Sequence, residues 1–179
     1  MFRIVVAGIL LSLAHAIAAM ADDAPAGLYG KSVVVVWGET RMQRNVGQPK
    51  FYQVVAVQTL SIYVSVNGRV FNRFGLQTGA GAAATDQVAG SEGARRIPKF
   101  NGQSMTMPLL FTTGGARNVA VEFGSKFDDC KAKITLAKKP GNELEIGFSN
   151  ITKKFIEFQS LTPDDASCKI QDGNVFADK

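Results

Sequence analysis

The sequence predicts an all-β protein, namely a single-domain antiparallel β-sandwich or flattened β-barrel of about seven to nine strands. Segments of alternating apolar and polar residues recur along the chain, separated by short stretches rich in Gly, Pro and Asn. Two of these segments meet at Asn67-Gly68, the dipeptide most typical of a tight β-hairpin turn. We expect at most one short helix, near residues 162–168, where Thr162 and Pro163 form a typical helix start before two acidic residues.

The first 21 residues have the pattern of a secretory signal peptide. Arg3 supplies the positive charge, Ile4–Ala18 the apolar stretch, and Ala19-Met20-Ala21 the cleavage site of small residues. The apolar stretch is shorter than the roughly 20 residues of a transmembrane helix, and no later segment is long and apolar enough to span a bilayer. We therefore expect an exported protein, secreted or periplasmic, whose mature form has no transmembrane segment.

Cleavage would remove His15, which is the only histidine of the chain. Nucleophiles, general bases and metal sites that depend on histidine are then excluded, and the two cysteines cannot form a four-cysteine site. An even cysteine pair in an exported chain is typical of a disulfide, so we expect Cys130 and Cys168 to be bonded. We predict no catalytic residues, no metal site and no cofactor.

After the signal peptide, residues 22–30 are expected to form a short lead-in and residues 31–179 a single β domain, because no linker divides them. The domain should contain a flexible loop over residues 75–96, since Gly79–Ala84 and Val88–Gly93 consist mainly of small residues without periodicity.

The first two strands are expected before this loop. Val33–Trp37 is a continuous apolar run, typical of a strand covered on both faces, and Gly38 next to it indicates a bulge or an edge. A polar connection with its turn at Gly47-Gln48-Pro49 then leads into a long strand over Tyr52–Val66.

The apolar pattern around Asn67-Gly68 selects one register for the hairpin. A two-residue loop would mix two arginines into the apolar face, whereas a three-residue loop, Val66–Gly68 with Gly68 left-handed, separates the faces. The predicted pairs are Leu60–Phe74, Ser61–Arg73, Tyr63–Phe71, Val64–Val70 and Ser65–Arg69. In this register Leu60, Ile62, Val64, Val70 and Phe74 face inward, with Asn72 as the one polar exception.

Strands are expected again from Ile97 onward. Pro108 restricts the segment Ser104–Thr112 to an edge or bulged strand, because proline cannot donate to a ladder. The next two strands, Asn118–Phe123 and Lys131–Lys138, alternate clearly between apolar and polar residues.

The remaining segments complete the predicted sheet. A turn at Pro140–Asn142 would pair Leu136 with Ile146 and Ile134 with Phe148 in a second hairpin. Ile151–Leu161 fits both helical and strand spacing, and we interpret it as a strand. Asp172-Gly173 predicts a final turn that returns Val175 and Phe176 to the core.

The outer face of the Asn67-Gly68 hairpin is the candidate ligand-binding site. From Thr40 to Thr85 the chain contains several basic residues and no acidic one. The proposed site residues are Tyr63, Phe71, Arg69 and Arg73. These side chains favour a non-enzymatic binding or interaction module, whose partner is an unknown protein or an anionic glycan of the cell envelope. Export and the lack of any nucleic-acid-binding motif argue against a nucleic-acid partner.

Two functions from other classes remain open. A hydrolase of envelope polysaccharides could work with two carboxylates facing each other across a cleft, although the sequence does not bring any two acids together. A carrier would instead hold a small apolar ligand in a cavity inside the barrel.

Overall fold

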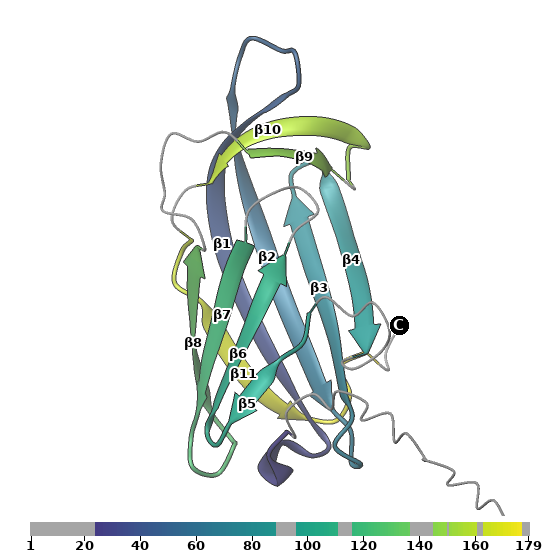
Figure 1. Cartoon of the computed structure of the whole chain (residues 1–179), viewed down its shortest axis with the longest axis vertical. Coiled ribbons are helices and arrows are strands. Elements are labelled where there is room, and N and C mark those ends of the chain that lie inside the picture. Colours follow the sequence, from purple (N-terminus) through teal and green to yellow (C-terminus); the bar gives the residue numbers. More distant parts are fainter. Residues whose placement is uncertain are drawn as a thin grey trace, which may run out of the picture.

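A computed structural model describes residues 24–88, 96–110, 116–136, 145–149, 151–160 and 163–176. The predicted signal peptide, residues 1–21, lies outside these ranges. The described residues form a curled antiparallel sheet and a smaller antiparallel sheet whose inner faces share one core (Figure 1). The predicted all-β class is therefore confirmed, with eleven strands in the described part of the chain instead of the expected seven to nine. No helix in that part is long and apolar enough to cross a membrane.

The larger sheet has the strand order β4-β3-β2-β1-β10-β9, and β11 also pairs with β1. Its strands are β1 (Lys31–Asn45), β2 (Tyr52–Val64), β3 (Val70–Thr78), β4 (Gly81–Val88), β9 (Glu145–Ser149), β10 (Lys154–Ser160) and β11 (Ser167–Asp172). The smaller sheet, in the order β5-β6-β7-β8, contains β5 (Lys99–Asn101), β6 (Ser104–Leu110), β7 (Ala116–Phe123) and β8 (Cys130–Leu136). A single 3-10 turn, η1 (Ala26–Leu28), precedes β1 in the described residues.

Strand β1 is the central strand of the larger sheet. Its ladder with β2 runs without a bulge through the pair Gly38–Val57, so of the two alternatives predicted for Gly38, a bulge or an edge, the bulge is wrong. On its other edge β1 pairs first with β11, up to Val36, and then with β10, from Arg41. Gly38 lies between these two partners, where its carbonyl accepts a 2.9 Å hydrogen bond from the backbone N–H of Asp164. The glycine therefore marks a change of neighbour.

Alternation along the strands produces the core. Val33, Val35 and Trp37 of β1 are buried, whereas Val34 and Val36 are only half-buried, so the run is fully covered on one face. The other buried side chains of the shared core include Leu60, Ile62 and Val64 of β2, Met105, Met107 and Leu109 of β6, and Val119, Val121 and Phe123 of β7.

The hairpin between β2 and β3 has the predicted register. Tyr63 pairs with Phe71 and Val64 with Val70, and Gly68 has a left-handed φ of 77°. The inward residues Leu60, Ile62, Val64, Val70 and Phe74 are all buried. The polar exception Asn72 is buried as well, and it bonds to Arg96. Its Nδ2 donates to the Arg96 carbonyl at 3.1 Å, and its Oδ1 accepts from Arg96 Nε at 2.9 Å.

The loop predicted over residues 75–96 is wrong for residues 75–88. Strand β3 continues to Thr78, and Gly81–Val88 form β4, which pairs with β3 along its whole length. A run of Gly and Ala does not alternate between apolar and polar residues, so the hydrophobic pattern gave no sign of a strand here. Backbone hydrogen bonds to β3 hold this strand in the sheet. Residues 89–95 of the predicted loop lie outside the described ranges.

The second predicted hairpin is also wrong. Strand β8 pairs with β7 in the smaller sheet, and β9 pairs with β10 in the larger one. Ile146, which was expected to pair with Leu136, is exposed. An alternating strand fits any neighbour of the same pattern, so alternation alone does not identify its partner. The predicted turn at residues 140–142 lies outside the described ranges.

Three other predictions, for an edge strand, a strand and a helix, have different outcomes. Pro108 of β6 lies beyond the end of the β5 ladder and pairs only with Asn118 of β7, so β6 is an edge strand at this point, as expected. Lys154–Ser160 form strand β10, in agreement with the strand interpretation. Residues 163–166, in contrast, are irregular and lead directly into β11, so no helix forms there.

A buried ion pair joins the two sheets. Glu39 of β1 has a fully buried side chain, and that of Arg117 of β7 is 4% exposed. Arg117 donates from Nε to Glu39 Oε2 at 2.9 Å and from its terminal nitrogen to Oε1 at 2.6 Å. Gln58 Nε2 of β2 donates to the same carboxylate at 2.9 Å. The carboxylate thus has hydrogen bonds from both sheets.

The predicted disulfide is confirmed. Cys130 of β8 is bonded to Cys168 of β11, with a Cα–Cα distance of 5.6 Å. The bond therefore connects an edge of the smaller sheet to the larger sheet.

We expect the Cys130→Ser/Cys168→Ser double variant to lose about 4 kcal/mol of unfolding free energy, because the bond closes a long loop of the unfolded chain. Urea denaturation measures this loss, and alkylation with intact-mass analysis of the wild type provides the control. Two alkylated thiols in the non-reduced protein, or an unchanged unfolding midpoint in the double variant, would contradict the assignment.

Candidate functional site

The outer face of the β2–β3 hairpin brings together three of the four predicted site residues. Tyr63 and Phe71 are half-buried, and their ring centroids lie 6.1 Å apart. The exposed guanidinium of Arg69 lies 5.6 Å from the centroid of the Phe71 ring. The aromatic pair and its cation follow directly from the three-residue turn, since this register places Tyr63 opposite Phe71.

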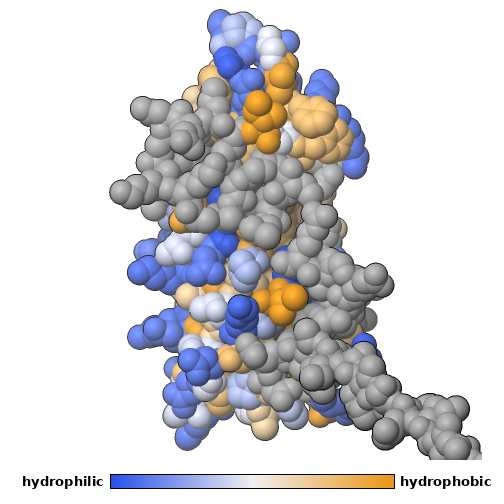
Figure 2. Space-filling view, in the orientation of Figure 1, coloured by the Kyte–Doolittle hydropathy of each residue, from blue (hydrophilic) through white to orange (hydrophobic). Residues whose placement is uncertain are grey.

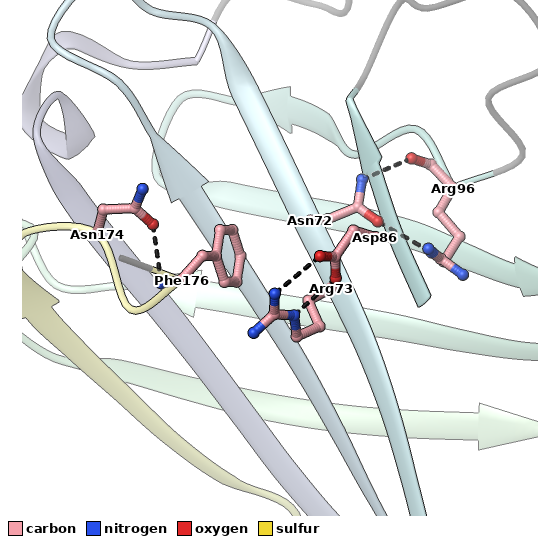
Figure 3. Close-up of polar contacts among 6 residues, drawn as sticks. All are labelled: Asn72, Arg73, Asp86, Arg96, Asn174 and Phe176. Carbon is pink, nitrogen blue, oxygen red and sulfur yellow. Dashed lines mark hydrogen bonds and ion pairs between the residues drawn. The ribbon is translucent and has the colours of Figure 1, made fainter. Parts of the chain in front are cut away.

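The fourth residue, Arg73, has an acidic partner that sequence analysis missed. It pairs across the ladder with Asp86 of β4, and Figure 3 shows the two-pronged contact. The distances are 2.6 Å from Nε to Oδ1 and 2.7 Å from the terminal nitrogen to Oδ2. Asp86 follows the acid-free stretch by one residue and falls within the predicted loop, so no pattern pointed to it.

This contact shifts the pKa of both groups. The hydrogen bond from Arg73 holds the pKa of Asp86 below its ordinary value, and the same bond raises the pKa of Arg73. Burial lowers the pKa of the nearby Arg96, and the negative charge of Asp86 acts in the opposite direction. Arg73 and Asp86 therefore form an ion pair at neutral pH.

The C-terminal segment crosses this outer face, and Phe176 stacks on Arg73 (Figure 3). The Phe176 ring centroid lies 5.0 Å from the Arg73 guanidinium carbon. Ser32 of β1 anchors the segment, because its Oγ donates to the Gly173 carbonyl at 2.7 Å and accepts from Val175 N–H at 3.2 Å. The predicted return of Val175 and Phe176 to the core is thus wrong, because both residues lie on the outer face.

Beside this segment, strands β2, β3 and β4 form the floor of a cavity of about 410 Å³. The cavity forms where outward positions carry small side chains, such as Thr59, Gly75 and Ala84. Its lining residues are Val57, Thr59, Ser61, Arg73, Gly75, Leu76, Gln77, Ala82, Ala83, Ala84, Val175 and Phe176. The volume lies within the range of small-molecule sites. The cavity, Arg73 and the aromatic pair thus form one continuous outer surface, which we call the outer-face site.

The outer-face site offers binding groups rather than reactive ones. Its cavity is lined by apolar side chains, two hydroxyls, one amide and one guanidinium, with no carboxylate among the lining residues. The carboxylate of Glu39 is engaged with Arg117 in the core. In the described ranges no cluster of three or more His, Cys, Asp or Glu side chains could hold a metal ion. The arrangement can stack, donate hydrogen bonds and attract anions.

Comparison of the chain with protein-family models, curated proteins and solved structures gives no match. The fold and the outer-face site together define an all-β protein with a partly aromatic groove, lined by one arginine, on one sheet.

We predict that an NMR titration will place the pKa of Asp86 below its ordinary value in the wild type and higher in Arg73→Ala, which lacks the hydrogen bond. A carboxylate whose pKa is lower in the folded state contributes stability above the unfolded pKa, and this contribution is lost as pH falls through the folded pKa. The stability difference between wild type and Arg73→Ala should therefore shrink below pH 3.8. Identical Asp86 titrations in the two proteins would show that the ion pair does not form in solution.

Proposed function

We propose that this protein is an exported, non-enzymatic binding module whose outer-face site binds an anionic glycan. The observation that carries the proposal is the cavity bordered by Arg73 and Phe176. Sugars combine apolar ring faces with many hydroxyls, so a groove with an aromatic ring, hydroxyls, an amide and a guanidinium is suited to them.

The charges near the groove favour an acidic ligand. Arg69 is exposed, and no acidic partner of its side chain is found in the described part of the chain. Asp86 is 61% exposed, so its ion pair with Arg73 is of the kind that contributes only about 0–1 kcal/mol. A carboxylate or sulfate of a ligand could therefore replace Asp86 at the Arg73 guanidinium with little loss of free energy.

The two alternative functions have less geometric support. A glycoside hydrolase requires two carboxylates about 5–10 Å apart across a cleft, and the groove lining contributes none. A carrier requires an apolar interior cavity, whereas large side chains such as Trp37, Leu60 and Met107 are buried together in the core between the sheets.

Affinity electrophoresis tests the proposal, with polygalacturonate as the acidic probe and dextran as the neutral one. Polygalacturonate should retard the wild type, and added salt should weaken this effect. Arg69→Ala/Arg73→Ala should lower the apparent affinity at least about tenfold, because two cations facing the ligand are lost. Asp86→Asn should increase the affinity, since it leaves Arg73 without its competing carboxylate.

Two further variants separate specific binding from general charge attraction. Lys131→Ala/Lys133→Ala removes the same charge from exposed positions of β8, in the other sheet, and should leave retardation nearly unchanged. Gly75→Val should narrow the groove and weaken binding, because a Cβ at Gly75 meets only Thr59, at 3.8 Å, and needs no rearrangement. Equal losses for the two cation pairs, or equal retention of wild type and Arg69→Ala/Arg73→Ala across a salt series, would overturn the proposal.

A further inference from the structure

Exposed hydrophobic side chains gather at the end of the molecule formed by the tip of the β1–β2 hairpin together with β9 and β10. Phe155 of β10 is 60% exposed, Ile146 of β9 is 59% exposed, and Val46 at the hairpin tip is 48% exposed. Figure 1 shows the tip projecting beyond β10, and Figure 2 shows hydrophobic side chains directly below it. We call this region the distal end, since the Asn67-Gly68 turn lies at the opposite end of β2.

The strand pairing makes these side chains one surface. The backbone N–H of Val46 donates to the Phe155 carbonyl at 3.1 Å, which joins the hairpin tip to β10. Phe155 pairs with Phe148 of β9, and the two rings meet edge to face with centroids 5.3 Å apart. Ile146 lies two residues from Phe148, and therefore on the same side of β9. The apolar surface thus extends over three chain segments.

The charge around this apolar surface is mainly positive. The lysines of this region, namely Lys50 of the hairpin tip, Lys153 of the β9–β10 turn and Lys154 of β10, are all exposed. Among the described side chains of residues 40–55 and 146–158, the only acid is Glu157, which forms an ion pair with Arg44. The distal end therefore combines exposed aliphatic and aromatic side chains with exposed lysines.

We infer that the distal end docks on the surface of an anionic lipid bilayer. Aromatic and aliphatic side chains on a projecting tip can enter the interfacial region, where aromatic rings are favoured. Lysines beside them would face the lipid headgroups, and each basic residue near an anionic surface contributes about a fivefold gain in affinity. The outer-face hairpin lies at the other end of β2, so lipid contact at the distal end leaves it accessible.

Vesicle co-sedimentation tests this inference, with the full mature protein and vesicles of phosphatidylcholine containing one third phosphatidylglycerol. We expect wild-type binding to these vesicles to be at least about tenfold tighter than to pure phosphatidylcholine. Phe155→Ser/Ile146→Ser and Lys50→Gln/Lys153→Gln/Lys154→Gln should each reduce it at least about tenfold. All these positions are exposed, so the variants should keep the wild-type melting temperature.

A fluorescent variant reports insertion directly. Val46→Trp should show a blue-shifted emission when anionic vesicles are added, whereas Val66→Trp, at the opposite end of the molecule and 72% exposed in the wild type, should not. Equal shifts in the two variants would overturn the inference.

Matched controls distinguish lipid binding by the distal end from general charge attraction and from self-association of the protein. Lys126→Gln/Lys131→Gln/Lys133→Gln removes the same charge from exposed positions of the β7–β8 turn and β8, and should leave vesicle binding nearly unchanged. An equal loss in this control, or equal wild-type binding to both vesicle types, would contradict the inference. A dimer in sedimentation velocity that Phe155→Ser/Ile146→Ser dissociates, without vesicle binding by the wild type, would assign the surface to a second copy of the chain.

Discussion

The ion pair between Glu39 and Arg117 is the interaction on which the two-layer structure depends. Moving a carboxylate and a guanidinium out of water costs several kcal/mol each, and only good geometry with further hydrogen bonds offsets this cost. Both conditions are met, since Arg117 binds the carboxylate with two nitrogens and Gln58 adds a third donor. Loss of one partner would leave an unpaired charge buried in the core. The two sheets must therefore pack in the arrangement that brings Glu39 and Arg117 into contact.

The position of this ion pair divides the larger sheet into two regions. On one side of it, apolar side chains such as Val33, Val35 and Trp37 pack against the smaller sheet. On the other side, β1 continues for six residues, from Thr40 to Asn45, and changes its partner from β11 to β10. The first region supports the outer-face site, and the second carries the distal end. Both candidate surfaces therefore belong to the same sheet but occupy different parts of it.

Two of the local patterns predicted structure correctly. The register of the β2–β3 hairpin followed from the turn residues and from the separation of apolar and charged faces, and it placed Tyr63 opposite Phe71. The disulfide followed from an even cysteine pair in a chain expected to be exported. The register was predictable because it rests on residues close in sequence. The disulfide was predictable because each of the two cysteines has only the other as a possible partner.

Long-range partners could not be predicted in the same way. The alternation of β8 is compatible with β7 or β9 as its neighbour, and only the packing of the two sheets selects β7. Asp86 and Phe176 reach Arg73 from two separate segments that both follow it in the chain, and neither has a local pattern that points to it. Glu39 did carry a signal, since it lies two residues after the inward Trp37 and therefore faces the core. A buried acid at that position required a buried cation.

A double-mutant cycle on Glu39 and Arg117 tests most directly whether the buried ion pair holds the sheets together. In urea denaturation, Arg117→Met should lose about 3 to 5 kcal/mol of unfolding free energy, because it leaves the Glu39 carboxylate buried without its cation. Glu39→Gln should also destabilise the protein, and the double variant should be more stable than the sum of the single losses by at least about 2 kcal/mol. Additive losses, within about 0.5 kcal/mol, would show that the two side chains do not interact and would contradict this account.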